Sequence, residues 1–159
     1  MTKNLLLLFC VIIILSGCAL SISLKDYNSI PKEERLVFGQ IKALNMGKNP
    51  RFNIFIKAEN SKTEFSDVIK DDGYFYWHLK PGKYIITHFL RYGIGRIWAT
   101  FEVNDNSDIT YIGTLNLMAN VVSEVSIKNN ITVAKEKLKN KFDLSELNIF
   151  TILMKKEGL

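Results

Sequence analysis

The chain has 159 residues, a formal net charge of +5 and two cysteines. This length predicts one domain with a packed hydrophobic core. Apart from Lys3, the positive residues are spread from Lys25 to Lys156, and such a distribution does not indicate a nucleic-acid-binding surface.

The first residues have the features of a targeting segment. Lys3 carries a positive charge, and an apolar run extends from Leu5 to Ile14. This run is long enough for the core of a signal peptide, but it is shorter than the ~20 residues needed to span a bilayer. Small residues and a cysteine then follow in Leu15-Ser16-Gly17-Cys18.

The tetrad that ends at Cys18 resembles the lipobox of bacterial lipoproteins. This resemblance implies cleavage before Cys18, a diacylglycerol thioether on its sulfur and an acyl chain such as palmitate on its amine. Ala19 in place of Asp is similar to the outer-membrane pattern of Gram-negative sorting. The expected location is the bacterial cell envelope, with the membrane bound through the lipid and the domain extracytoplasmic. The alternative is an ordinary secretory signal with an incidental cysteine.

Removal of residues 1–17 leaves Cys18 as the only cysteine. No intramolecular disulfide can then form, so the stability must come from the packed core. Residues 18–35 are polar and irregular, and they predict a lipidated tether before a domain over residues 36–159. Nucleic acid is not an expected partner outside the cytoplasm.

Short runs rich in β-branched and aromatic residues follow, each bounded by Gly, Pro, Asn or Asp. This regular spacing predicts a mainly β fold, an antiparallel β-sandwich with a short C-terminal helix. The predicted strands are Leu36–Leu44, Arg51–Ala58, Glu64–Ile69, Tyr74–Leu79, Tyr84–Leu90, Arg96–Val103, Thr110–Met118 and Val121–Lys128.

The segment 80–83 reads Lys-Pro-Gly-Lys and suits a type II turn. We therefore predict a hairpin with Leu79 opposite Tyr84 and Trp77 opposite Ile86. Because side chains alternate along a strand, one face of this hairpin is expected in the core. That face consists of Phe75, Trp77, Leu79, Tyr84 and Ile86.

The stretch from Gly73 to Ile86 resembles the Gly-x-Phe-x-Trp-x-Leu-x-Pro-Gly-x-Tyr-x-Ile pattern of transthyretin-like, or carboxypeptidase regulatory-like, sandwiches. Phe38-Gly39-Gln40-Ile41 is similar to the first-strand Gly-x-Ile step of the same family. The resemblance implies a fold and carries no active site. It also implies a binding, cohesion or accessory role rather than an enzymatic one.

The pattern changes after Asn130. Thr132 can cap a helix in which Ala134, Leu138 and Phe142 recur every four residues. We expect this helix to pack along the sandwich, and a basic amphipathic membrane helix is the alternative. The final run Leu147–Met154 fits a strand or a helix, and its β-branched and aromatic content favours a strand.

No catalytic motif, metal site or cofactor site is predicted. His78 and His88 are the only histidines, and the expected hairpin places them on opposite faces. Residues 104–108 read Asn-Asp-Asn-Ser-Asp, but they lack the Gly and Glu of a calcium loop and indicate a polar turn. The Asp71-Asp72-Gly73 segment is also expected to be a hairpin turn.

The candidate binding patch is aromatic. The residues expected to project from the face opposite the core are Tyr74, Tyr76, His78, Phe89 and Trp98. Such rings can stack on a sugar or anchor a protein partner, unless the C-terminal helix or last strand covers them. The sequence thus predicts a non-catalytic binding or accessory module that contacts an envelope protein or glycan. The alternative is a membrane-tethered hydrolase or glycan-processing enzyme that uses loop carboxylates.

Overall fold

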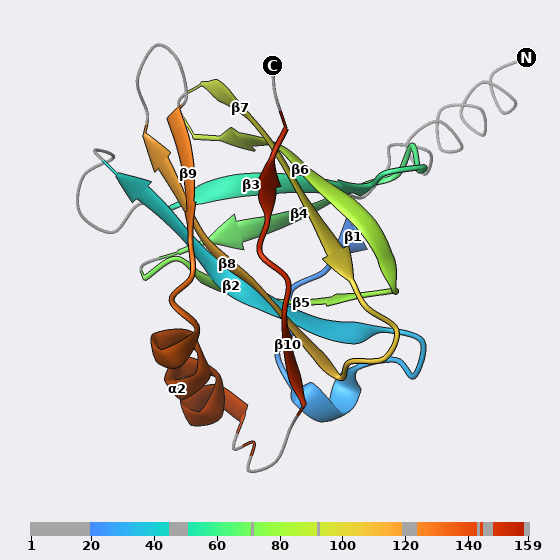
Figure 1. The fold of residues 1–159 in the computed structure, drawn as a ribbon. Coiled ribbons are helices and arrows are strands. Elements are labelled where there is room, and N and C mark those ends of the chain that lie inside the picture. Colours follow the sequence, from blue (N-terminus) through green and yellow to red (C-terminus); the bar gives the residue numbers. More distant parts are fainter. Residues whose placement is uncertain are drawn as a thin grey trace, which may run out of the picture.

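The computed structural model describes residues 20–44, 51–70, 72–91, 93–118, 124–142, 144 and 148–157; the predicted signal peptide and Cys18 lie outside them. The described part of the chain is mainly β (Figure 1). Its elements are β1 (Leu20–Ser21), η1 (Tyr27–Ser29), β2 (Arg35–Leu44), β3 (Phe52–Ala58), β4 (Glu64–Ile69), β5 (Tyr74–Leu79), β6 (Gly82–Leu90), β7 (Ile94–Val103), β8 (Ile109–Met118), β9 (Glu124–Lys128), α2 (Ile131–Phe142), β10 (Ile149–Thr151) and β11 (Lys155–Lys156). The eight predicted strands are therefore present, and the bounds of β4 and β5 match the prediction.

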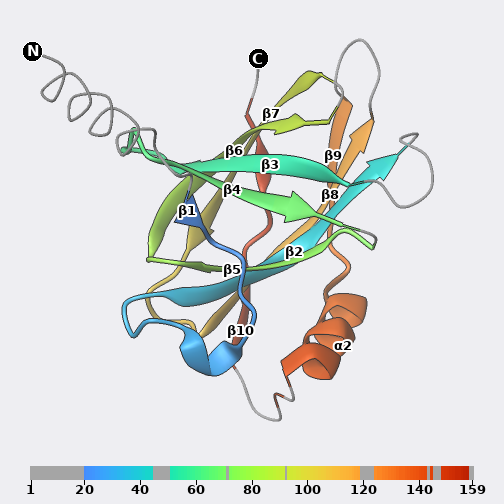
Figure 2. The same cartoon turned by 180° about the vertical axis from the view of Figure 1, so that it is seen from behind.

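The strands form two sheets. Sheet A has the order β1-β4-β3-β6-β7-β11, and sheet B has the order β10-β8-β2-β5, with β9 also paired to β8. Figure 2 shows β1 beside β4 at one edge of sheet A, with the following chain passing β5 of sheet B. One side of the sandwich is therefore bounded by β1 and β4 from one sheet and by β5 from the other.

The prediction of purely antiparallel pairing is wrong. The pairs β1–β4, β2–β8 and β8–β10 are parallel. Parallel partners need a long crossover between them, and the chain between β2 and β8 supplies one because it builds most of sheet A. The local strand patterns carry no information about such distant pairing.

The predicted hairpin between β5 and β6 is also wrong. β5 pairs with β2 in sheet B, whereas β6 pairs with β3 and β7 in sheet A. The Lys80–Lys83 segment therefore links the two sheets, and the hydroxyl of Tyr84 donates a hydrogen bond of 2.8 Å to the carbonyl of Lys80. The Asp72-Gly73 segment likewise connects β4 of sheet A to β5 of sheet B rather than forming a hairpin.

The core assignment is confirmed despite this change of pairing. The five residues predicted to face inward are all buried, namely Phe75, Trp77, Leu79, Tyr84 and Ile86. Trp77 is fully buried and stacks on Phe75 with ring centroids 3.8 Å apart. Alternation is a property of each strand by itself, so it gives the correct inward face even where the partner strand is wrong.

A bulge in sheet A changes which side chains of β6 face inward. Ile86 lies opposite Ala99 and His88 lies opposite Arg96, so Thr87 is out of regular register. Phe89 consequently turns into the core and is only 6% exposed. Trp98 on β7, within the same irregular region, has a φ of 52°.

The N-terminal segment packs against the sandwich from residue 20 on, and its described part is not a free tether. β1 pairs with β4, Ile22 and Leu24 are buried, and the amide of Leu24 donates a 2.7 Å hydrogen bond to the carbonyl of Tyr76. Packing of this kind fixes the chain because apolar residues leave water and backbone groups find partners.

Helix α2 packs on sheet B, which confirms the expectation of a helix packed along the sandwich. Ala134 and Leu138 are buried, and Phe142 lies against Tyr76 with ring centroids 5.3 Å apart. The helix begins at Ile131, so Thr132 is not its cap, and the amide of Ile131 donates a hydrogen bond of 3.2 Å to Oδ1 of Asn129. Strand β10 pairs with β8, which confirms a strand within the last apolar run.

Candidate functional site

The structure does not bring the five residues of the predicted aromatic patch together. Tyr74, Tyr76 and His78 share the outer side of β5, but Phe89 is in the core and Trp98 belongs to sheet A. The prediction of one shared surface is therefore wrong. It depended on pairing β5 with β6 and on an unbroken alternation along β6.

The rings on β5 are covered in part by other elements. Lys141 of α2 places its Nζ 4.6 Å from the ring centroid of Tyr76, and Phe142 meets the same ring edge-on. His78 pairs through Nδ1 with a carboxylate oxygen of Glu34 from the N-terminal segment. The expected alternative, a helix that covers these aromatic residues, is confirmed for Tyr76.

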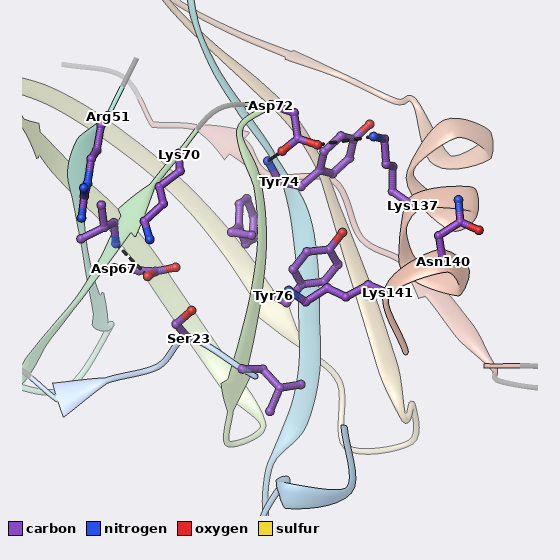
Figure 3. A pocket seen from close by; sticks show the side chains of 13 residues that line it. Ser23, Arg51, Asp67, Lys70, Asp72, Tyr74, Tyr76, Lys137, Asn140 and Lys141 are labelled. Atoms are coloured by element: carbon purple, nitrogen blue, oxygen red, sulfur yellow. Dashed lines mark hydrogen bonds and ion pairs between the residues drawn. The ribbon is translucent and has the colours of Figure 1, made fainter. Parts of the chain in front are cut away.

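A cleft of about 600 Å³ opens beside this covered patch. It lies over β5, between the β4 side of the sandwich and helix α2 (Figure 3). We call it the basic cleft, and its lining residues are Ser23, Leu24, Arg51, Asp67, Val68, Lys70, Asp72, Tyr74, Phe75, Tyr76, Lys137, Asn140 and Lys141. Its volume lies within the range typical of small-ligand sites.

The basic cleft carries an excess of positive charge. Figure 3 shows Arg51 and Lys70 on one side of β5 and Lys137 and Lys141 on the helix side. The Nζ of Lys137 lies 3.5 Å from a carboxylate oxygen of Asp72 and 5.8 Å from the ring centroid of Tyr74. Cations that converge on one cleft attract anionic ligands and raise their local concentration.

Both carboxylates of the basic cleft already have partners. Asp67 accepts hydrogen bonds from the indole Nε1 of Trp77 at 2.8 Å and from the amide of Val68 at 2.7 Å. Asp72 accepts a bond from the amide of Tyr74 at 3.2 Å and also pairs with Lys137. These two groups balance part of the positive charge, and both are held in place by the partners named above.

Two tyrosines supply neutral polar groups. Burial raises the pKa of Tyr76 to about 12, with smaller contributions from the charges of Asp72 and Tyr74. Burial, followed by Asp72, also raises the pKa of Tyr74. Both phenols therefore stay protonated at physiological pH and can donate hydrogen bonds to an anion.

A second polar cluster lies on sheet A. The hydroxyl of Thr87 is 3.0 Å from Oε1 of Glu64 and 2.9 Å from Nδ1 of His88, whose ring stacks on Phe55 at 4.2 Å. In a catalytic triad the base lies between the nucleophile and the carboxylate, whereas here the hydroxyl lies between the other two groups. Thr87 is also only 9% exposed, so its hydroxyl is poorly accessible to a substrate.

The two histidines lie in different sheets, His78 on β5 and His88 on β6, rather than on opposite faces of one hairpin as predicted. No group of three or more metal-ligating His, Cys, Asp or Glu side chains occurs in the described part of the chain. The 104–108 segment forms a turn in which Oδ1 of Asn104 accepts from the amide of Asn106, while Asp105 pairs with Arg35 at 3.0 Å.

Comparison of the chain with protein-family models, curated proteins and solved structures returned no match. What the basic cleft can bind is therefore inferred from the residues that line it. Among the residues that the structure describes, no helix combines the length and the apolar character that crossing a bilayer requires.

The cationic residues of the basic cleft were not predicted as a site. They come from the chain before β3, the end of β4 and one face of α2, and only the folded chain brings them together. The sequence contained one relevant signal, the lysines at alternate positions in residues 135–141. That pattern alone indicates a solvated helix face.

Proposed function

We propose that the chain is a lipid-anchored protein of the bacterial cell envelope whose extracytoplasmic β-sandwich binds an anionic ligand without catalysis. The lipobox-like tetrad ending at Cys18 supports the anchor, and the Ala after it favours the outer membrane in a Gram-negative cell. The Gly73–Ile86 pattern supports the transthyretin-like form of the sandwich.

The observation that carries the binding role is the charge of the basic cleft. Four cationic side chains line it together with two carboxylates, and the carboxylates are already engaged by Trp77, Lys137 and backbone amides. A ligand that carries phosphate or carboxylate groups would gain charge-assisted hydrogen bonds from the cations and the two phenols. Arg51 can bind such a group through two parallel bonds, and the lysines act as point charges.

The hydrolase alternative requires a polar group that is free to act as acid or base. Asp67 and Asp72 are the two carboxylates of the basic cleft that could take this role, and each accepts hydrogen bonds that fix its position. The cleft therefore favours ligand binding over hydrolysis. Turnover of a glycan by the wild type, lost in both Asp67→Asn and Asp72→Asn, would reverse this order.

The test uses the lipidated protein in an uncharged detergent and isothermal titration calorimetry. Glycerol phosphate is the probe and glycerol is the neutral control. We expect glycerol phosphate to bind, with an affinity that falls as salt is added, and glycerol to give no signal. The Lys137→Glu, Lys141→Glu double variant should lose binding, because it reverses two of the four positive charges of the cleft.

The matched control is Lys155→Glu, Lys156→Glu. These exposed residues form β11 at the opposite edge of sheet A from β1. This variant makes the same change in net charge away from the cleft, so it should keep binding. Equal binding by all three proteins would show that the basic cleft is not the ligand site.

A further inference from the structure

Only a few residues separate Cys18 from the basic cleft, and those from Leu20 on are packed against the sandwich. Leu20 begins β1, two residues after Cys18, and Ser23 already lines the cleft. An extended chain covers at most about 3.6 Å per residue, so Cys18 lies within about 18 Å of Ser23 along the backbone. The cleft is therefore close to whatever Cys18 is attached to.

The segment 20–24 forms backbone hydrogen bonds with both sheets. Leu20 and Ser21 pair with Phe65 and Ser66 of sheet A. Beyond them, the carbonyl of Ile22 accepts a 3.1 Å hydrogen bond from the amide of His78 in sheet B, next to the Leu24–Tyr76 bond. With Ile22 and Leu24 also buried, this segment cannot act as a long flexible linker.

The side of the sandwich that carries β1 is also the side where the basic cleft opens. Ser23 and Asp67 lie on its β1–β4 flank, and Lys137 and Lys141 lie on the helix flank (Figure 3). The described lysines of β11 are at the other edge of sheet A. Leu20, the described residue nearest to Cys18 in the chain, is thus at the edge of sheet A that flanks the basic cleft and not at the β11 edge.

We propose that the basic cleft docks onto anionic phospholipid headgroups of the membrane that holds the Cys18 acyl chains. This inference rests on the proposed function, because it takes both the anchor and the anion-binding cleft from it. A headgroup phosphodiester carries a negative charge and accepts hydrogen bonds, which matches the guanidinium, ammonium and phenol groups of the cleft. Anionic lipid then orients the domain that the acyl chains tether.

Helix α2 contributes to this contact through its lysines and not by inserting its apolar face. Ala134 and Leu138 are buried against sheet B, so these apolar side chains of the helix are not available to insert into a bilayer. Lys137 and Lys141 remain exposed on the cleft side. The basic membrane helix considered from the sequence is therefore replaced by a headgroup contact made by a helix that stays packed on its sheet.

The experiment measures the reactivity of individual lysines in the lipidated protein on vesicles. The vesicles contain phosphatidylcholine alone or equimolar phosphatidylcholine and phosphatidylglycerol, and an amine-labelling reagent is read out by peptide mass spectrometry. We expect labelling of Lys70, Lys137 and Lys141 to fall several-fold on the anionic vesicles. Labelling of Lys155 and Lys156 should not change, which makes β11 an internal control.

Salt and charge reversal test the cause of the protection. Raising the salt concentration toward 1 M, where the screening length is about 3 Å, should restore labelling of the cleft lysines. The Lys137→Glu, Lys141→Glu variant should lose the protection of Lys70, while Lys155→Glu, Lys156→Glu should keep it. Far-UV circular dichroism shows whether each variant is folded, and the wild-type comparison of the two vesicles needs no variant at all.

The outcomes separate this inference from the proposed function. Binding of glycerol phosphate in detergent without protection on phosphatidylglycerol vesicles would overturn the inference and leave the proposed function in place. Equal protection of the cleft lysines and of the β11 lysines would also overturn it, because the contact would then be unspecific. Absence of both binding and protection, or of acylation at Cys18 by mass spectrometry, would overturn both.

Discussion

The indole Nε1 of Trp77 donates a hydrogen bond of 2.8 Å to a carboxylate oxygen of Asp67, and this bond joins the two sheets. Trp77 belongs to β5 of sheet B and is fully buried, whereas Asp67 belongs to β4 of sheet A. Asp67 also lines the basic cleft. The Asp67 side chain therefore both connects the two sheets through a hydrogen bond and lines the basic cleft.

We expect Asp67→Ala to lower the free energy of unfolding by about 1–3 kcal/mol, because it leaves the buried Trp77 N–H without its acceptor. Denaturant unfolding measures this change. Asp105→Ala is the matched control, since Asp105 forms an ion pair with Arg35 while its own side chain is 75% exposed. Exposed pairs contribute about 0–1 kcal/mol, so a loss in Asp67→Ala as small as that in Asp105→Ala would show that the Asp67–Trp77 bond contributes little to stability.

The inward faces of the strands could be predicted from the sequence, whereas the sheet to which each strand belongs could not. Phe75 and Trp77 alternate with polar or amphipathic neighbours within one strand, and this local pattern survives any pairing. The segment after Leu79 contains Pro and Gly, and these residues suit a link between sheets as well as a hairpin. Only long-range packing decides between the two.

The candidate site was predicted less well than the core. Each error concerned the face or the sheet on which a residue lies. Phe89 was assigned outward by counting from Tyr84, and the irregular register at Thr87 reverses that count. Arg51 and Lys70 precede β3 and follow β4, and nothing in the sequence relates them to Lys137. A cleft assembled from distant segments has no local periodicity that a sequence could reveal.

Trp77→Ala should lower the free energy of unfolding by about 3–5 kcal/mol, because it empties a fully buried position. Tyr76→Ala, one residue away, should have a smaller effect, since Tyr76 is only half-buried between Phe142 and Lys141. Chemical denaturation of both variants gives the comparison. Equal, large losses would show that the outer face of β5 is packed as tightly as the core.

Gly73→Ala should be strongly destabilising, by about 1–3 kcal/mol or more. Gly73 has a φ of 78°, and an added Cβ would lie 2.2 Å from the carbonyl oxygen of Ile41. Gly93→Ala is the control, because no heavy atom lies within 4 Å of an added Cβ there. Thermal unfolding of the two variants checks the difference, and similar melting temperatures would contradict the tight turn between β4 and β5.

Cys18→Ala should prevent lipid attachment and leave the precursor unprocessed, because alanine has no thiol to take up a diacylglycerol. Mass spectrometry of the membrane fraction compares it with the wild type, for which a lipid-modified N-terminus at Cys18 is expected. Cys10→Ala is the control, since Cys10 lies within the apolar run that the proposed processing would remove. An unmodified wild-type N-terminus would refute the anchor.

The last prediction concerns Tyr76 at high pH. Burial is the largest cause that raises its pKa from 10.0 to about 12, so the folded protein holds the phenol proton more tightly than the unfolded chain does. Unfolding therefore releases this proton at a pH between these two values, and the stability that depends on it is fully present below about pH 10 and lost by about pH 12.

Tyr76→Phe removes the titrating hydroxyl and keeps the ring beside Phe142 and Lys141. The melting temperature of this variant should accordingly fall less steeply than that of the wild type as the pH rises above 10. Tyr27, Tyr74 and Tyr84, whose pKa values are also raised, are present in both proteins and cancel in the comparison. Parallel curves would mean that Tyr76 ionises as readily in the folded protein as in the unfolded chain, and that its hydroxyl is open to water rather than partly enclosed beneath α2.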